Sequence, residues 1–280
     1  MALISVIVTT YNWPEILETC LSSLLEQEDT SFEIIIADDG STADTRRTID
    51  KFIHQSRIPI KHAYHDDRGF RAGTIRNKAV KLSKGNYLIF IDGDCTVLPN
   101  FIKRHRQLAE QGYFVPGNRI LLSQSFTSTI LKENTPLHTR SSFFFIQQWI
   151  TRKINRITPL FYNPFPFIRY SNPFRWQKAM TCNLAMFKSD FISVNGFDEA
   201  FEGWGYEDSD LVIRLIHNGI RRKEGRFAVP VIHHWHTQND QSKHDENYDR
   251  LMLRLNDPNF IYAEQGFDQY VELNFTTVHF

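Results

Sequence analysis

The chain has 280 residues, of which 41% are hydrophobic, and its 32 basic side chains balance its 32 acidic ones. These values are ordinary for a globular protein with one large domain or two small ones. The zero net charge argues against a chain that binds nucleic acid over its whole surface. The three cysteines are widely spaced without a Cys-x-x-Cys motif, which favours a reducing compartment over a disulfide framework.

Membrane and export signals are not expected. No uncharged apolar run approaches the roughly 20 residues of a membrane span. The first predicted strand begins within a few residues of Met1, with no charged region or cleavage site of a signal peptide. We therefore predict a cytoplasmic protein, which could still lie against a membrane.

The first 95 or so residues alternate between apolar strands and amphipathic helices. Strands are predicted at 3–10, 32–37, 60–64 and 88–91, with helices from Pro14, after Ser41-Thr42, and at about 74–82. This β-α-β-α-β-α-β order is typical of a parallel sheet with helices on its faces. Because the crossovers are right-handed, the carboxyl ends of the strands share one rim, where ligands bind.

Polar residues follow three of these strands directly: Thr9-Thr10-Tyr11-Asn12, Asp38-Asp39-Gly40-Ser41 and Asp92-Gly93-Asp94. The chain has neither a Gly-x-Gly-x-x-Gly fingerprint after the first strand nor a Gly-Lys-Ser/Thr phosphate loop. Carboxylates and hydroxyls can hydrogen-bond a base or ribose and can hold Mg²⁺ or Mn²⁺. They cannot cradle a free phosphate, so the metal ion would have to hold the phosphate oxygens.

Asp92 and Asp94 are expected to point the same way, because side chains at i and i+2 of a strand share a face. Both carboxylates could then meet one metal ion. The alternative is an Asp-Gly turn that closes a hairpin.

The pattern changes after Gly112. A strand is predicted at 113–122, followed by a segment rich in basic and aromatic residues. Residues 121–180 contain eight Lys/Arg and one acid, Glu133, together with Phe143-Phe144-Phe145, Trp149 and the aromatic run 161–167. This composition suits an anionic lipid surface or an anionic acceptor. Alternatively, the aromatic side chains pack a helical subdomain onto the sheet.

The last part of the chain returns to regular patterns. A strand at 181–187 precedes a short helix capped by Ser189 or Asp190, and a longer helix ends at Asn218-Gly219. A strand at 227–232 leads into His233-His234-Trp235-His236. The tail is polar, then amphipathic, and 271–280 is compatible with an extra strand.

Four motifs occur in an order that resembles the family 2 glycosyltransferases with the GT-A fold: Asp38-Asp39-Gly40-Ser41, residues 71–77, Asp92-Gly93-Asp94 and Gly203-Trp204-Gly205-Tyr206-Glu207-Asp208. The last motif is also similar to the Trp-Gly-Gly-Glu-Asp region of β1,4-galactosyltransferases and bacterial chondroitin polymerases. The resemblance covers about 3–110 and 180–240, and leaves out 121–178.

The resemblance implies an α/β, GT-A (Rossmann-like) fold, with a mostly parallel sheet flanked by helices and an aromatic, basic insert at 121–178. It implies one domain over 1–280, with a nucleotide-binding half at 1–110, an acceptor-binding half at 111–240 and a C-terminal tail at 241–280.

On the donor side, the resemblance makes Asp39 a uracil-binding residue, with Thr9 and Tyr11 lining the base pocket. A carboxylate that accepts the imide N–H would favour uracil over cytosine, which lacks that donor. The alternative is that Asp38 or Asp39 only caps the following helix.

The segment with Arg71, Arg76 and Asn77 resembles the nucleotide-contacting loop of the family. An arginine beside a helix start suits a pyrophosphate. Either arginine could instead pair with Asp66 or Asp67, so which one reaches the nucleotide stays open.

For the metal ion, the resemblance implies that Asp92 approaches the ribose or the metal and that Asp94 ligates it. The ion would neutralise the leaving pyrophosphate as a Lewis acid. His233 and His236 are the expected remaining ligands, with His234 pointing the opposite way to His233. Imidazole favours Mn²⁺ over Mg²⁺. Three histidines in four residues could also form a zinc site, but no cysteine pattern supports one.

For catalysis, the resemblance makes Asp208 the general base and Glu207 a ligand of the acceptor sugar, with inversion in a single displacement. The helix dipole would help to keep the base ionised. The alternative is that Asp208 or Asp210 only caps the helix. Trp204 is a candidate sugar platform or a core residue. Tyr206 stands where the family shows a second glycine, and could stack on a sugar or change which donor fits.

The sequence thus predicts an inverting, metal-dependent transferase that moves a hexosyl or N-acetylhexosaminyl unit from a UDP-sugar to a glycan or glycolipid. Bacterial surface polysaccharide or lipopolysaccharide core is the expected product, with contact to the inner membrane surface through 121–178 and no nucleic-acid partner. The alternatives are a metal-dependent phosphohydrolase or nucleotidyltransferase, and a carbohydrate-binding module without activity.

Overall fold

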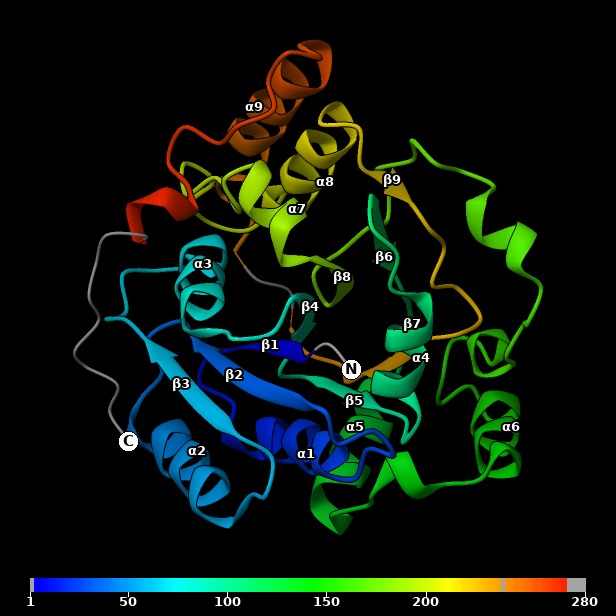
Figure 1. The fold of residues 1–280 in the computed structure, drawn as a ribbon. Helices are drawn as coiled ribbons and strands as arrows, with labels where there is room; N and C mark the ends of the chain where they lie inside the picture. Colours follow the sequence, from blue (N-terminus) through cyan, green and yellow to red (C-terminus); the bar gives the residue numbers. More distant parts are fainter. Residues whose placement is uncertain (1–2, 238–239, 271–280) are drawn as a thin grey trace.

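The computed structural model describes residues 3–237 and 240–270. A seven-stranded sheet with the order β3-β2-β1-β4-β8-β6-β9 forms its centre (Figure 1). β3, β2, β1 and β4 are parallel, while β8 runs antiparallel to both β4 and β6. The predicted mostly parallel α/β sheet is therefore confirmed. Its strands are β1 (Ile4–Thr10), β2 (Phe32–Asp38), β3 (Ile60–Tyr64), β4 (Tyr87–Asp92), β6 (Tyr113–Pro116), β8 (Asn183–Phe187) and β9 (Arg221–Arg222).

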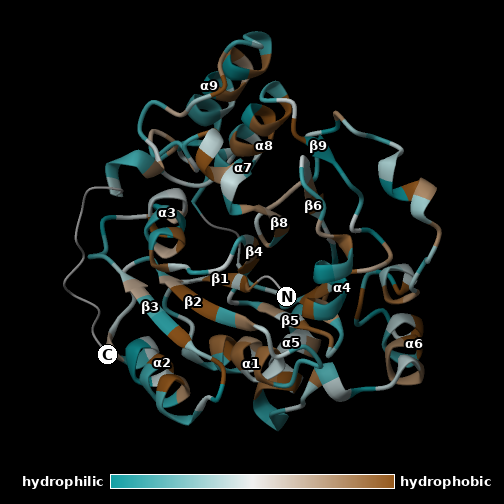
Figure 2. Cartoon of the chain, viewed as in Figure 1, coloured by the Kyte–Doolittle hydropathy of each residue, from teal (hydrophilic) through white to brown (hydrophobic). Residues whose placement is uncertain are grey.

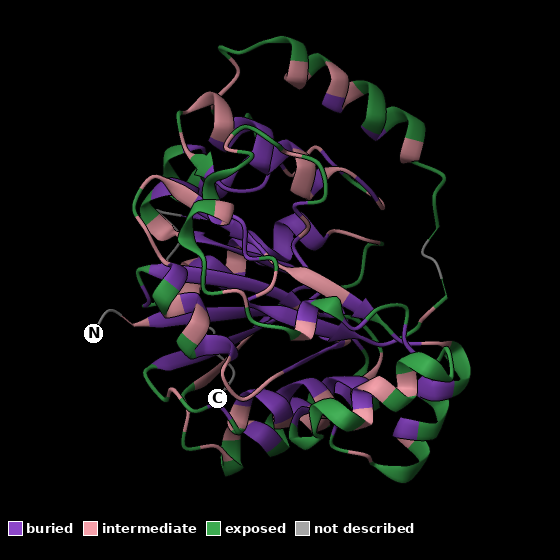
Figure 3. Cartoon of the chain, turned by 90° about the vertical axis from the view of Figure 1, so that its right-hand side faces the viewer, coloured by how far each residue is buried: buried purple, intermediate pink, exposed green. Residues whose placement is uncertain are grey.

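Helices cover both faces of this sheet (Figure 1). Alternate side chains of β1 face opposite layers, so Val6 and Val8 join one apolar cluster and Ile7 the other. The central strands are buried between the helical layers in Figure 3, and β2 is largely hydrophobic in Figure 2, whereas the edge strand β3 is partly hydrophilic. One cluster includes residues of α1 (Pro14–Leu25), α2 (Ala43–Gln55) and α4 (Phe101–Leu108), and the other residues of α3 (Ala72–Leu82), α7 (Lys188–Ser193) and α8 (Glu207–His217).

A second, three-stranded sheet has the order β5-β10-β7. β10 (Pro230–His233) runs antiparallel to β5 (Cys95–Val97) and parallel to β7 (Asn118–Leu121). The prediction of one strand at 113–122 is wrong, because β6 and β7 belong to different sheets. Gly117 separates the two strands. A Cβ atom at this position would lie 2.1 Å from the Asn183 amide nitrogen.

Two further expectations need correction. Neither Ser189 nor Asp190 caps α7, because its N-cap residue is Phe187 and no side chain caps it. The strand predicted at 227–232 begins only at Pro230. The amphipathic part of the tail forms α9 (His244–Asn256), followed by the short helix η4 (Phe267–Tyr270), and the predicted strand at 271–280 lies outside the described residues.

The 121–178 segment has a small apolar core of its own. Phe126, Phe145 and Ile154 pack there with Ile120 of β7 and Ile232 of β10. Its helices are α5 (Gln124–Glu133), η1 (Leu137–Thr139), α6 (Ser142–Ile150), η2 (Thr158–Leu160) and η3 (Pro166–Tyr170).

Other aromatic side chains of this segment are exposed to solvent. They are Phe143, Trp149, Phe161, Tyr162, Phe165, Phe167, Tyr170 and Phe174. The core-packing alternative therefore accounts for only part of the aromatic residues. Among residues 3–237 and 240–270, no helix combines the length and apolarity that crossing a bilayer requires.

Candidate active site

The predicted strand-end residues meet where the strand order reverses. β1 lies between β2 and β4 and is parallel to both. The carboxyl ends of the three strands therefore lie on the same edge of the sheet. Thr9 is paired in register with Asp92, and Thr10 with Asp38. In open α/β sheets this switch point forms the ligand-binding crevice.

Arg76 of α3 links three parts of this edge. Its Nε donates to Thr9 Oγ1 at 2.9 Å, Nη1 to Glu207 Oε1 at 3.0 Å and Nη2 to Asp92 Oδ1 at 3.2 Å. Arg76 is buried. Burial alone would lower its pKa, but Asp92 and Glu207 outweigh that effect and raise the pKa. Here the guanidinium binds protein groups and joins the donor side to the start of α8.

Asp39 is held from two sides at the end of β2. Its Oδ1 lies 2.6 Å from His65 Nε2, and its Oδ2 accepts from the Arg71 backbone N–H at 2.9 Å. Asp38, by contrast, accepts from the Ser41 N–H at 2.8 Å. Turn formation therefore uses Asp38. Each Asp39 oxygen keeps a second lone pair that could accept from a ligand.

Tyr11 and Arg71 lie beside this aspartate. The Tyr11 hydroxyl donates to Asp67 Oδ2 at 2.9 Å, and its side chain is half exposed. Arg71 Nη2 donates to the Asp66 backbone oxygen at 2.7 Å. Its buried Nε has no hydrogen-bond partner.

Asn77 is the predicted nucleotide contact that the structure separates from this rim. It is fully buried, and its amide nitrogen donates to Phe197 O and Glu199 Oε1, both at 2.9 Å. Its Oδ1 accepts from the Phe197 N–H at 3.0 Å. These bonds link α3 to the loop that precedes α8.

The Asp92-Gly93-Asp94 motif forms a turn, but it closes no hairpin. β4 and β5, which it joins, belong to different sheets. Gly93 N–H donates to Thr9 O at 2.7 Å, and a Cβ there would approach the same oxygen to 3.1 Å. The argument that both carboxylates share one strand face is therefore wrong. Asp92 reaches Arg76, whereas Asp94 turns toward the histidines.

Asp94 Oδ2 lies 3.5 Å from His233 Nε2 and 3.2 Å from His236 Nε2. Burial raises the pKa of Asp94, and the positive charge of a protonated His233 would oppose that shift. β10 ends at His233, so the strand does not continue through His234, whose Nε2 lies 2.9 Å from Thr96 Oγ1. Burial lowers the pKa of His234 to about 3. One carboxylate and two imidazoles at these distances fit Mn²⁺.

Cys95 is a neighbour that the sequence did not indicate. Donor atoms of Asp94, Cys95 and His233 all lie within 4.8 Å of one another. Burial, followed by the Asp94 charge, raises the pKa of the Cys95 thiol well above its ordinary value. Without a metal ion this sulfur is therefore a neutral thiol.

Glu207 and Asp208 begin α8. Burial and the neighbouring Glu207 charge raise the pKa of Asp208 to about 7. The expected help from the helix dipole is therefore outweighed. Asp210 is also no cap, because Arg214 donates to its Oδ2 at 2.9 Å and 2.6 Å inside the core. Tyr206 is the N-cap residue of α8.

An aromatic group, defined as Trp204, Tyr206, His244 and Tyr248, stands beside the start of α8. His244 stacks on Trp204 at 6.3 Å between ring centroids, and its Nε2 lies 2.9 Å from the Tyr206 hydroxyl. Tyr248 lies 5.5 Å from Tyr206. Trp204 is thus no core residue. His244 and Tyr248 were missed because only tertiary folding brings α9 here.

Tyr206 adopts φ +71°. This left-handed conformation costs a non-glycine residue about 1–2 kcal/mol. That cost explains why glycine suits the position, and it indicates that the tyrosine ring has a use that offsets the strain.

Two family profiles match the chain. One, described as "Glycosyl transferase family 2", matches residues 5–171, and the other, described as "N-terminal domain of galactosyltransferase", matches residues 167–238. Together they extend over both halves of the site.

Characterised relatives share a quarter or more of their aligned residues with this chain. Validoxylamine A glucosyltransferase of Streptomyces hygroscopicus subsp. jinggangensis is 28% identical over 262 residues, which are 90% of this chain and 59% of that protein. Hyaluronan synthase of Pasteurella multocida is 28% identical over 236 residues, 77% of this chain and 23% of that protein. The chain thus spans less than two thirds of the length of these relatives.

Solved structures share the fold. Staphylococcus aureus TarS (residues 1–349) has a TM-score of 0.58 at 16% identity, over 90% of this chain and 64% of that one. The mannosyltransferase PcManGT of Pyrobaculum calidifontis, solved in complex with GDP-Man and Mn²⁺, has a TM-score of 0.55 at 14% identity. The match covers 90% of this chain and 62% of that one. These likenesses confirm the predicted GT-A fold. The matches give no support to a phosphohydrolase or nucleotidyltransferase.

The contacts of Asn77 generate a first prediction. Asn77→Ala should lower the free energy of unfolding by about 2–4 kcal/mol, because it leaves buried Phe197 backbone groups without partners. Asn77→Asp should cost at least as much, since it places a second carboxylate against Glu199. Chemical denaturation measures both effects, and UDP titration checks the alternative. Normal stability with lost UDP binding would instead make Asn77 a nucleotide contact.

Proposed function

Because the chain belongs to glycosyl transferase family 2, we propose that it moves a hexosyl or N-acetylhexosaminyl unit from a UDP-sugar to a glycan or glycolipid, with inversion and with a divalent metal ion. The match over residues 5–171 establishes the family, and the transfer reaction, the donor, the ion and the acceptor are proposed. The observation that supports it is the Arg76 contact that joins Thr9 and Asp92 at the strand-end rim to Glu207 at the start of α8.

We assign the donor base to Asp39, Thr9 and Tyr11. An Asp39 carboxylate already oriented by His65 would accept the uracil imide N–H without further ordering. TarS has been solved with UDP and with UDP-GlcNAc, whereas PcManGT was solved with GDP-Man. Fold alone therefore does not choose the base, and Asp39 is the residue on which the choice depends.

For the diphosphate, Arg71 is the better candidate of the two arginines. The Arg76 guanidinium is already bonded to Thr9, Asp92 and Glu207. Asp94, His233 and His236 would hold Mn²⁺, with Mg²⁺ as the alternative, and Asp92 would face the ribose or the ion. When bound, the ion supplies Lewis-acid neutralisation of the leaving UDP.

Asp208 would take the proton from the acceptor hydroxyl as that oxygen attacks the anomeric carbon. The new C–O bond forms on the face opposite the departing UDP oxygen, so the configuration inverts. A base with a pKa of about 7 combines a large ionised fraction at neutral pH with useful basicity. Glu207, oriented by Arg76, would bind an acceptor hydroxyl.

Trp204 and Tyr206 would bind the acceptor sugar, with His244 and Tyr248 completing the platform. Sugar rings present apolar C–H faces that stack on aromatic rings, and their hydroxyls can reach the exposed edges. Tyr248 is 43% exposed, so a ring can approach it from solvent.

We also propose that 121–178 contacts the inner face of a bacterial membrane, where a glycolipid such as a lipopolysaccharide core precursor would be glycosylated. All Lys and Arg residues of this segment except Arg169 are exposed, next to its exposed aromatic side chains. Basic and aromatic side chains together favour an anionic lipid interface.

The donor assignment predicts nucleotide preference. With Mn²⁺ present, UDP should raise the melting temperature more than GDP or CDP, and one UDP-sugar should be turned over. Asp39→Asn should weaken UDP binding by about 1.5–3 kcal/mol, because it removes a charged hydrogen-bond acceptor. Calorimetric titration measures this. Stronger binding of GDP, or an Asn variant with normal UDP affinity, would contradict the assignment.

The Asp208 assignment predicts a pH profile. The base must be deprotonated, so kcat/KM should rise about tenfold per pH unit below pH 7 and level off above it. Asp208→Asn should lower kcat about 100-fold or more and remove this limb. Asp50→Asn, an exposed change on α2, serves as control. If kcat/KM of the Asp208→Asn variant keeps the same pH dependence below pH 7, another residue is the general base.

The membrane assignment predicts binding to vesicles. The protein should sediment with phosphatidylglycerol vesicles and not with phosphatidylcholine vesicles, and salt should weaken this binding. R152E/K153E should weaken it about tenfold or more, at about 1 kcal/mol per basic residue. R47E/K51E on α2 makes the same charge change elsewhere. Equal effects of both double variants would rule out 121–178 as the contact.

A further inference from the structure

Cys95 adds a sulfur to the Asp94–His233–His236 set. β5 and β10 are antiparallel, and Cys95 is paired in register with His233. Directly opposed residues project to the same face of a sheet. Cys95 Sγ lies 3.5 Å from Asp94 Oδ1, so the thiol approaches the carboxylate as well as the imidazole.

The spacing of these donors suits a small tetrahedral ion. Zinc bonds of about 2.0–2.3 Å place tetrahedral ligands about 3.3–3.7 Å apart. Asp94 Oδ2 lies 3.2 Å from His236 Nε2 and 3.5 Å from His233 Nε2, and the other Asp94 oxygen, Oδ1, lies 3.5 Å from Cys95 Sγ. Ligand atoms of Asp94, Cys95 and His233 all lie within 4.8 Å of one another. Two imidazoles, a carboxylate and a thiol are together a donor set that zinc accepts.

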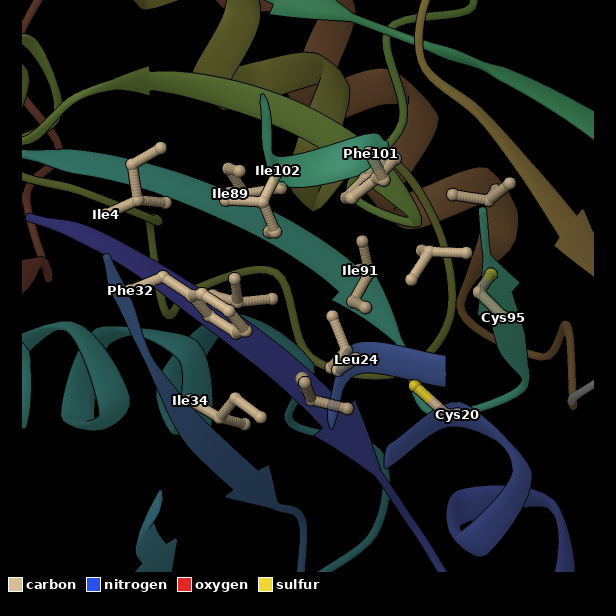
Figure 4. Packing of buried hydrophobic residues seen from close by; sticks show 14 of the residues in the cluster. Ile4, Cys20, Leu24, Phe32, Ile34, Ile89, Ile91, Cys95, Phe101 and Ile102 are labelled. Atoms are coloured by element: carbon tan, nitrogen blue, oxygen red, sulfur yellow. The ribbon is translucent and has the colours of Figure 1, made fainter. Parts of the chain in front are cut away.

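The other two cysteines do not join this set. Cys20 Sγ lies 4.0 Å from the Asp92 backbone oxygen, and Cys182 meets Cys95 through its backbone oxygen at 3.8 Å. Figure 4 shows Cys20 and Cys95 among buried apolar side chains near the end of β4. Within the described part of the chain, the clustered ligand atoms belong to Asp94, Cys95 and His233.

We propose that Cys95 joins Asp94 and His233 as a donor that lets this site take a thiophilic divalent cation such as Zn²⁺, with His236, 3.2 Å from Asp94 Oδ2, closing the shell as the fourth ligand. This rests on the proposed metal site. Four protein ligands leave a tetrahedral ion no open position for a diphosphate, so zinc would inhibit transfer. Mn²⁺, which prefers oxygen and nitrogen ligands, needs no contact with the sulfur.

Zinc binding would ionise the Cys95 thiol. The thiol proton passes to solvent, and the sulfur electron pair forms the metal–sulfur bond. One proton is therefore released from Cys95 for each zinc ion bound. Nothing is oxidised or reduced.

Cobalt(II) tests the assignment by spectroscopy, since it occupies zinc sites and reports a thiolate ligand. Metal-free protein titrated with Co²⁺ should develop a near-ultraviolet sulfur-to-cobalt charge-transfer band and the visible bands of tetrahedral cobalt. C95S should lose the charge-transfer band and bind Zn²⁺ at least about tenfold more weakly. C182S, which removes a buried thiol next to these ligands, should keep both the charge-transfer band and the Zn²⁺ affinity. Absence of the band in the wild type, or its persistence in C95S, would overturn the proposal.

Two further measurements keep the test independent of variant folding and of transferase activity. Calorimetry in buffers of different ionisation enthalpy counts the protons released on zinc binding, using the wild-type chain alone, and no release attributable to a thiol would overturn the proposal. A Cys95-dependent band without any UDP-sugar transfer would contradict the proposed function and support the sulfur assignment. Mn²⁺-dependent transfer without the band would overturn the sulfur assignment alone.

Discussion

The buried guanidinium of Arg76 is the contact on which the arrangement of the site depends. It bonds Thr9 of β1, Asp92 at the end of β4 and Glu207 at the start of α8. A buried cation is tolerated only when its charge and its N–H groups are paired. Loss of one partner would leave an uncompensated charge. The Arg76 bonds therefore fix the positions of β1, β4 and α8 relative to one another. The strand-end rim and the start of α8 are thereby coupled.

A second constraint is the passage of the chain from the large sheet to the small one. β4 ends at Asp92, and the close approach of Gly93 to Thr9 turns the chain into β5. β10 then pairs with β5 and brings His233 beside Asp94 and Cys95. The cluster of Asp94, Cys95 and His233 is therefore a product of strand pairing between distant segments. The aromatic group of Trp204, Tyr206, His244 and Tyr248 lies beside the start of α8.

Much of the fold could be predicted from local patterns. The strand ends at Thr10 and Asp38, the start of α1 at Pro14 and the end of α8 at Asn218-Gly219 agree with the sequence signals. The sequence could not show that 113–122 forms two strands, because their separation depends on Asn183, which fills the space beside Gly117. Periodicity reports which face is apolar, and says nothing about which sheet receives each half of an apolar run.

The sequence by itself determined the order of the elements and the chemical type of each strand end, because these follow from apolar periodicity and turn chemistry over a few residues. It also supplied the motif order on which the family assignment depended. Only the tertiary structure decided that Arg76 bridges the two halves, that Asn77 is an internal link, and that Cys95 lies beside Asp94 and His233. Those outcomes depend on side chains far apart in the chain, whose partners are chosen by packing and strand register.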